Sequence, residues 1–371
     1  MFPEDLFAFV LEQFAVDIGG LEATQPPPLQ IDSFIARSVM QKAIRRGMTE
    51  LALRAASALI TTDRRTLWRR LLVTALEDLG IGEVDLLARI VAAYRDRAWV
   101  MGAGGEWRVI SALIRQACEG TRCQAANDLW NVAKNDLTLD AFKGSLCEAE
   151  LPDLLGIMTD EGEPMDRRGV AVLIALGEDV GPAAPCHIKA DPGAIFAAFA
   201  GAGRYSHVVA IYEAAFRQSR LALAPLSLCL WSESREIELA GNDDDLPPVT
   251  WLGEVPSFAL DQYTRPGLAA IRRYSYSSRS WRDFAERWQI ARGDWPKAAG
   301  ELLFRVEGAV VTNRRTWGAG DRMYQRSASL GCLMPEAAVS EGKTLIVREL
   351  PHIDKFRGLS LPTTPPAQRA P

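Results

Sequence analysis

The chain has 371 residues, 48% hydrophobic and 24% charged, which is the balance of a globular protein with two or three domains. Its longest apolar runs are far too short to cross a bilayer, and its acidic start lacks the features of a secretory signal, so we expect a cytoplasmic protein without membrane contact. Because the net charge is -5, the overall field cannot explain a local basic patch.

The first predicted element is a short amphipathic helix over residues 1–18, in which Leu6, Phe7, Val10 and Phe14 are apolar. Three consecutive prolines at 26–28 then predict a stiff, extended linker. Residues 1–32 therefore form an N-terminal helix and linker, and residues 33–150 are predicted to form a helical domain.

Residues 38–82 contain three apolar stripes at helical spacing, separated by short turns. Gly47 is suited to end the first helix in a left-handed conformation, and Thr49 is suited to cap the next one. The third stripe follows Asp63 and ends at Gly80 and Gly82. Short loops of this kind predict an antiparallel helical array.

The same stretch is strongly basic, with nine Lys or Arg residues against two acidic residues between positions 37 and 70. Three interpretations remain open: a solvated helix face, a surface for phosphate or nucleic acid, and a surface for an acidic protein. The candidate nucleic-acid-binding residues here are Arg45, Arg46, Arg69 and Arg70.

The stretch from Trp68 to Gly80, with Arg69-Arg70-Leu71 and Glu77-Asp78-Leu79, resembles the helical C-terminal region of clamp-loader-like AAA+ ATPases. The similarity is to the replication-associated recombination ATPases and covers roughly residues 33–135. It implies a collar or oligomerisation domain, with Trp68, Glu77, Asp78 and Gly80 in structural roles. It also implies a setting in DNA replication or repair, with an AAA+ ATPase or a second copy of the chain as partner.

The phosphate-binding loop of such an ATPase is missing from the sequence. The nearest match, Glu341-Gly342-Lys343-Thr344, has Ala337 where the pattern G-x-x-x-x-G-K-[ST] requires its first glycine. We interpret this segment as a turn before a strand over residues 344–347. The resemblance therefore predicts a collar-type module without its motor, and no cofactor.

Helical patterns continue over residues 151–241, and the segment from Asn242 to Pro248 is the clearest loop. Residues 250–358 are predicted to form a basic and aromatic domain, α or α+β, with a few short strands. Residues 359–371 are proline-rich and are expected to be disordered. The fold class is thus mostly α.

The C-terminal domain interleaves arginines with aromatic residues, a composition that suits phosphate binding and base stacking. The candidates are Arg265, Arg272, Arg273, Arg279 and Trp281. Two alternatives remain open. Trp281, Phe284 and Trp288 could be the core stripe of one helix, or the surface could bind a protein.

The segment 255–267 is suited to start a helix, with Thr264 as the N-cap and Pro266 in the first turn. Asp261 is expected to pair with Arg265 or Arg272. A helix N-terminus among arginines predicts phosphate contact, and the alternative is a buried junction between loop and helix.

Catalytic motifs are not recognisable in the sequence. Cys118 with Cys123, and Cys186 beside His187, do not form the paired knuckles of a zinc site, so no metal is predicted. We predict a non-catalytic accessory factor in DNA replication, repair or a mobile element, which binds DNA, an AAA+ partner or itself. The alternatives are a purely structural helical scaffold and a nucleic-acid-processing enzyme with an unrecognised carboxylate site, for which Glu77, Asp78 and Glu106 are the candidates.

Overall fold

The computed structural model describes residues 3–21, 23–146, 148–181, 191–203, 206–233, 241–315 and 317–361. Over these residues the fold is mostly α-helical, and its strands form two antiparallel pairs of two residues each. This confirms the predicted fold class. The first two residues of the predicted tail 359–371, Leu359 and Ser360, are helical instead. Residues 362–371, and the pair Cys186 and His187, lie outside the described residues.

The chain divides into two compact units, each assembled from segments that are far apart in sequence. Unit 1 comprises residues 1–22, 71–242 and 313–330, and unit 2 comprises residues 23–70, 243–312 and 331–371. The expected linear order of domains therefore differs from the observed units. The basic segment 37–70 and the arginine-rich segment after residue 260, which the sequence separates, belong to the same unit.

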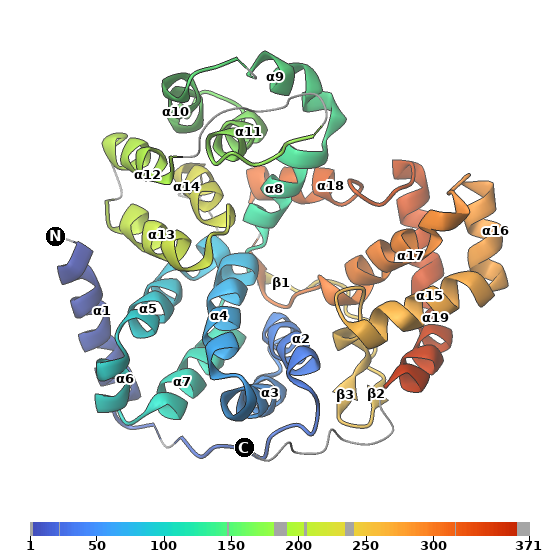
Figure 1. The fold of residues 1–371 in the computed structure, drawn as a ribbon, viewed down its shortest axis with the longest axis horizontal. Helices are drawn as coiled ribbons and strands as arrows, with labels where there is room; N and C mark the ends of the chain where they lie inside the picture. The colour runs from blue at the N-terminus through green and yellow to red at the C-terminus, as the bar shows by residue number, and fades with distance from the viewer. Residues whose placement is uncertain are drawn as a thin grey trace. The chain divides into compact units, whose positions relative to one another are not determined.

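In unit 1, α8, α11 and α14 pack on one another, and α5 packs against α1, α7 and α13 (Figure 1). Helix α11 is buried through Val170–Ala175 because its sequence is apolar on every side there. The sequence predicts helices over residues 1–18 and 151–240, and for the residues that the structure describes it confirms them as α1 and α10–α14. The α-helices that lie wholly within the unit are α1 (Pro3–Ile18), α5 (Val84–Arg95), α6 (Arg97–Gly102), α7 (Glu106–Glu119), α8 (Ala125–Asn135), α9 (Asp140–Ser145), α10 (Leu151–Thr159), α11 (Met165–Ala175), α12 (Pro192–Gly201), α13 (Ser206–Ser219), α14 (Leu223–Glu233) and α18 (Gly318–Ser327).

Helix α4 (Arg64–Thr74) continues into a π-helical turn, η1 (Ala75–Leu79), and a 3-10 turn, η2 (Gly80–Gly82). The predicted helix end at Gly80 is confirmed, since Gly80 has a φ of 49°. A side chain there would collide with the carbonyl oxygen of Cys123, so the close approach also requires glycine. The antiparallel strands β1 (Gly241–Asn242) and β4 (Arg314–Arg315) also belong to this unit.

An ionic clamp attaches α18 to the rest of unit 1. Arg326 lies 2.6 Å from both Asp136 and Asp166, and Asn131 donates to the carbonyl oxygen of Ser327. Replacing Arg326 with methionine should lower the free energy of unfolding by about 1–3 kcal/mol, because two largely buried carboxylates lose their shared cation. Urea titration of Arg326→Met against Arg322→Met, an exposed neighbour on α18, measures this difference. Equal stability of the two variants would contradict it.

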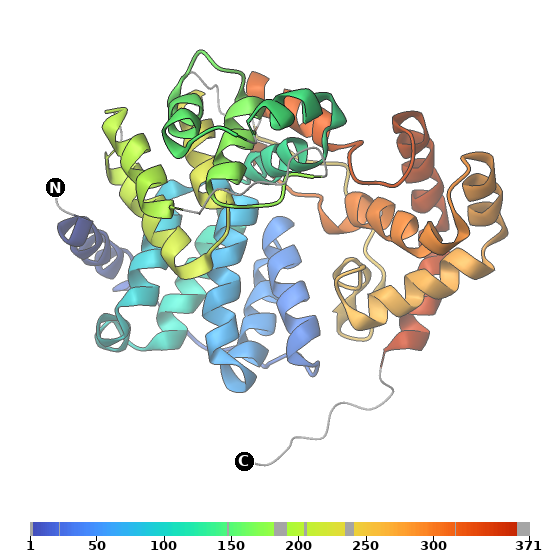
Figure 2. The ribbon, with the colours of Figure 1, turned by 45° about the horizontal axis from the view of Figure 1, so that its top comes forward.

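Unit 2 has a helical core to which four helices contribute, α15 (Arg265–Ser277), α16 (Arg279–Arg287), α17 (Trp295–Leu303) and α19 (Glu336–Ser360). Helix α19 packs against both α15 and α17 (Figures 1 and 2). The remaining helices and strands are α2 (Ser33–Arg45), α3 (Thr49–Thr62), η5 (Ser257–Ala259), η6 (Arg292–Asp294), η7 (Phe304–Gly308), β2 (Trp251–Leu252) and β3 (Val255–Pro256).

Two local predictions for unit 2 are wrong. Residues 344–347 are not a strand but lie inside α19, because Leu345, Ile346, Leu350 and Ile353 recur at helical spacing and are buried in the core. Met48, rather than Thr49, is the N-cap of α3. The left-handed conformation predicted for Gly47 is confirmed, with a φ of 64°.

Candidate functional site

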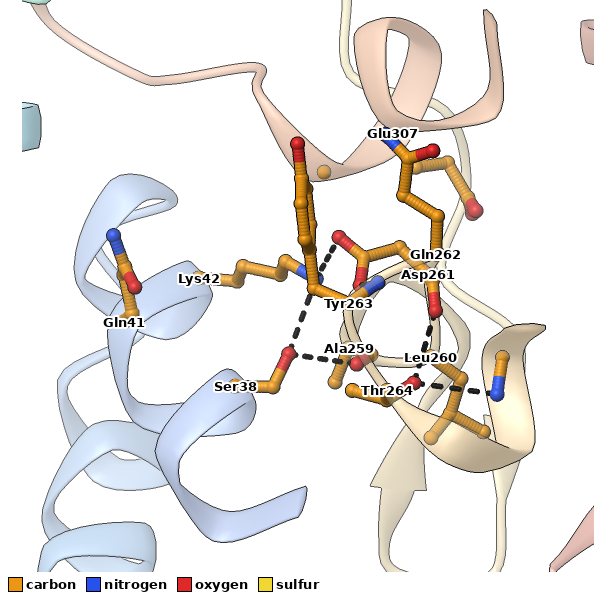
Figure 3. A network of polar contacts seen from close by, with 12 residues as sticks. Ser38, Gln41, Lys42, Ala259, Leu260, Asp261, Gln262, Tyr263, Thr264 and Glu307 are labelled. Carbon is orange, nitrogen blue, oxygen red and sulfur yellow. Dashed lines mark hydrogen bonds and ion pairs between the residues drawn. The ribbon is translucent and has the colours of Figure 1, made fainter. Parts of the chain in front are cut away.

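A buried ion pair joins α2 to the loop before α15. The ammonium group of Lys42 lies 2.6 Å from the carboxylate of Asp261, and both side chains are almost fully buried (Figure 3). One turn earlier on α2, the hydroxyl of Ser38 donates to the carbonyl oxygen of Ala259 at 2.7 Å. The expected pairing of Asp261 with Arg265 or Arg272 is therefore wrong, and its partner lies 219 positions earlier in the chain.

The start of α15 is closed by its own cap. Thr264 accepts from the N–H of Gly267, as predicted, and its carbonyl oxygen accepts from the N–H of Leu268. A side chain at Gly267 would collide with the carbonyl oxygen of Asp261. The junction is buried, and the N–H groups of Gly267 and Leu268 already donate to Thr264. The structure therefore supports the alternative of a buried junction between loop and helix.

A second buried cation, Arg357 on α19, ties three segments of unit 2 together. Its guanidinium lies 2.7 Å from Glu307 and 2.7 Å from Asp354, and it donates to the carbonyl oxygen of Leu260 at 2.9 Å. Its side chain is 0% exposed. Arg357 thus links α19, the π-helical turn η7 and the same loop that receives Lys42.

Burial changes the protonation of Lys42. Desolvation lowers its pKa from 10.5 to about 8, although the nearby Asp261 carboxylate acts in the opposite direction. Arg45 and Arg357 add a smaller repulsion that also lowers the pKa. The environment therefore disfavours the charged form of Lys42 even with its counter-ion in contact.

Three residues that the sequence predicts to bind nucleic acid make contacts within unit 2 instead. Arg45 is buried and donates to the carbonyl oxygen of Gly308, and Arg46 donates to that of Glu307 at 3.0 Å. Trp281 is 0% exposed and packs against Phe284 and Tyr274, so it cannot stack on a base. The prediction is wrong for Arg45, which is buried, and for Trp281, which lies in the helical core of unit 2.

The exposed side of α15 is basic. The helix contains three arginines and no acidic residue. Arg265, Arg272 and Arg273 are exposed, and within the described part of the chain none of them forms an ion pair. Arg265, Arg272 and Tyr276 recur at helical spacing and so share one face.

Helix α2 extends this surface at the start of α15. Phe34 is 54% exposed, and the guanidinium carbon of Arg37 lies 3.9 Å from its ring centre. The guanidinium carbon of Arg265 lies 6.0 Å from the same ring. The two arginine-rich segments of the sequence therefore meet at one aromatic side chain. We define the basic face as Phe34, Arg37, Arg265, Arg272, Arg273 and Tyr276.

Sequence reasoning missed Phe34. Its position off the apolar stripe of α2, whose buried members include Ile35, Val39 and Met40, is the signal that could have identified it.

The other predicted residues occupy separate places. Arg69 is exposed, Arg70 donates to Gln41 at 2.9 Å, and Arg279 lies 3.9 Å from Asp283 on its own helix. Trp68 is buried. None of these belongs to the basic face as the structure defines it.

The carboxylates of Asp78 and Glu106 have polar partners, and so does the backbone carbonyl of Glu77. Asp78 accepts from Gln124 at 3.0 Å, the carbonyl oxygen of Glu77 accepts from Asn127, and Glu106 lies 3.7 Å from Arg97. Among the described residues, no group of three or more His, Cys, Asp or Glu side chains is placed to hold a metal ion.

The charges of the chain are unevenly divided between the units. Unit 2 has 23 Lys or Arg residues and 17 Asp or Glu residues, a net charge of +6. Unit 1 has 19 and 30, a net charge of -11. The basic face thus belongs to a unit whose own charge attracts anions.

Comparison with family models, with curated proteins and with solved structures gave no match for this chain. Within the described ranges, no helix has the length and apolar character needed to cross a membrane.

Proposed function

We propose that this protein is a non-catalytic accessory factor that binds nucleic acid through the basic face of unit 2. The observation that supports this most is the exposed side of α15, which has three arginines and no carboxylate. Such a surface gains affinity from phosphates because each neutralised phosphate releases condensed counter-ions. The resemblance to clamp-loader-like ATPases supports a setting in DNA replication, repair or a mobile element.

The buried ionic contacts support the same function indirectly. Lys42 fixes α2 to the loop before α15, and α2 carries Phe34 and Arg37 at its first turn. The contact therefore holds the two parts of the basic face in a fixed arrangement. Preorganised cations bind a phosphate backbone at a lower entropic cost than mobile ones.

The test is binding of labelled DNA, measured by fluorescence anisotropy at several salt concentrations. Raising salt from about 50 to about 200 mM should weaken binding by about 10- to 100-fold for three or four phosphate contacts. The variant Arg272→Glu/Arg273→Glu should bind about 10-fold more weakly or worse, because two attractions become repulsions.

The matched control is Arg115→Glu/Arg322→Glu, which changes the net charge equally but replaces exposed arginines of unit 1. It should bind DNA nearly as the unaltered protein does. Equal weakening by both variants, or binding that does not change with salt, would contradict the proposal. Lack of binding to any nucleic acid would also contradict it, and would favour a protein partner for the basic face.

A further inference from the structure

We infer that the basic face binds a single strand, with Phe34 and Tyr276 stacking on its bases. This inference rests on the proposed function and adds the class of nucleic acid. It starts from the observation that two aromatic rings remain substantially exposed within a surface that is otherwise cationic. Phe34 is 54% exposed and Tyr276 is 41% exposed.

Phe34 is held in place without being covered. Arg37 packs on its ring, and the Nε of Arg37 donates to the carbonyl oxygen of Ser33 at 3.2 Å. The first turn itself is fixed by Asp32, which accepts from the N–H groups of Phe34 and Ile35. A ring presented rigidly beside two guanidinium groups is suited to stack on a base.

Tyr276 is fixed in a similar way at the other end of α15. Its hydroxyl donates to the carbonyl oxygen of Arg292 at 3.4 Å, and its ring centre lies 6.1 Å from that of Trp295. The guanidinium carbon of Arg292 lies 5.9 Å from the Trp295 ring. Arg292, a further exposed cation, therefore lies near Tyr276.

The length of the basic face along α15 suits several nucleotides of one strand. Arg265 and Tyr276 are eleven residues apart on α15, which corresponds to a rise of about 16 Å. Arg272 lies between them on α15, and the Phe34 ring centre lies 6.0 Å from the guanidinium carbon of Arg265, at the start of the helix. A strand along the face would thus meet a ring, cations and a second ring in succession, which is the arrangement of single-strand-binding surfaces.

A duplex would not use the exposed rings. Its bases stack on one another inside the helix, so it presents phosphates to α15 but no free base faces. The arginines alone would serve both forms of nucleic acid, whereas the rings favour the single strand. Stacking of this kind is largely independent of base identity, so we expect little sequence preference.

The experiment compares three probes of equal length on the full chain, a single-stranded oligothymidine, a duplex and an abasic single strand. Phe34→Leu and Tyr276→Leu remove each ring but keep an apolar side chain. Each should weaken oligothymidine binding by about 5- to 100-fold, because stacking contributes about 1–3 kcal/mol per base. Binding of the duplex and the abasic strand should stay unchanged.

The control is Val347→Ala, which shortens an exposed apolar side chain of α19 in the same unit and should leave all three probes unaffected. Circular dichroism confirms that each variant is folded. If the duplex binds as tightly as the oligothymidine and the ring variants change nothing, the inference is wrong, while salt-dependent binding still supports the proposed function. If no probe binds at all, the proposed function fails and the inference fails with it.

Discussion

Replacing Arg357 with methionine should lower the free energy of unfolding by about 3–5 kcal/mol, the cost of breaking a buried ion pair from one side. Arg357 is fully buried, and its guanidinium serves Glu307, Asp354 and the carbonyl oxygen of Leu260 together. Methionine fills a similar volume, so no cavity is created. The loss of stability therefore measures the cost of leaving two carboxylates and one carbonyl without their hydrogen-bond donor.

Chemical denaturation followed by circular dichroism measures this effect, and hydrogen exchange locates it. The amides of α15 and α19 should lose protection, since the loop and the helix that Arg357 joins belong to unit 2. Arg348→Met is the matched control, because Arg348 is exposed on the same helix and should change stability by less than about 0.5 kcal/mol. A cost for Arg357→Met below about 1 kcal/mol would show that the cluster has no structural role.

Local signals in the sequence predicted much of the fold. The helices over residues 151–240 follow from apolar spacing, and Gly47 and Thr264 end and begin helices through their own backbone and side-chain chemistry. These features depend on residues within about one turn of each other. They therefore need no knowledge of what lies across the core.

Long-range contacts were not predictable in the same way. Asp261 pairs with Lys42, although Arg265 and Arg272 are much nearer in sequence, because helix packing brings α2 to the loop. Charge pattern alone cannot distinguish Arg45, which turns inward, from Arg37, which contacts an exposed ring. The β-branched residues of the segment 344–347 favour a strand, and the core of unit 2 overrides that preference.

The division into units explains why only part of the basic face could be predicted from the sequence. Residues 23–70 complete a unit whose remaining parts begin at residue 243, so Phe34 and Arg265 meet across more than half of the chain. A linear reading places them in different domains. The basic face forms because residues 23–70 and 243–312 belong to one unit, although 172 residues of unit 1 (71–242) lie between them in sequence.

The ion pair of Lys42 and Asp261 should fix the position of α2 against the loop before α15 without adding net stability to the fold. Desolvation lowers the pKa of Lys42 to about 8 despite the contact with Asp261, so the cost of burying the charge exceeds the attraction. Lys42→Met alone should destabilise the protein by about 3–5 kcal/mol at neutral pH, because it leaves the buried Asp261 carboxylate without its cation. The double variant Lys42→Met/Asp261→Leu should be about as stable as the unaltered protein, or more stable.

The same pair should make the free energy of unfolding depend on pH in a predictable direction. The folded protein releases the Lys42 proton near pH 8 and the unfolded chain near pH 10.5, so the unfolded state binds more protons between these values. Stability of the unaltered protein relative to the double variant should therefore rise with pH across this window, by about 1 kcal/mol or more per pH unit at its steepest.

Comparing the two proteins at each pH cancels the titration of tyrosines and other groups that they share. Urea midpoints at pH 7, 8, 9 and 10 suffice for this comparison, and the m-values show whether the denatured states remain alike. A relative stability that is flat or falls with rising pH would show that Lys42 keeps its proton in the folded state. The attraction of Asp261 would then offset the full cost of burying the Lys42 charge.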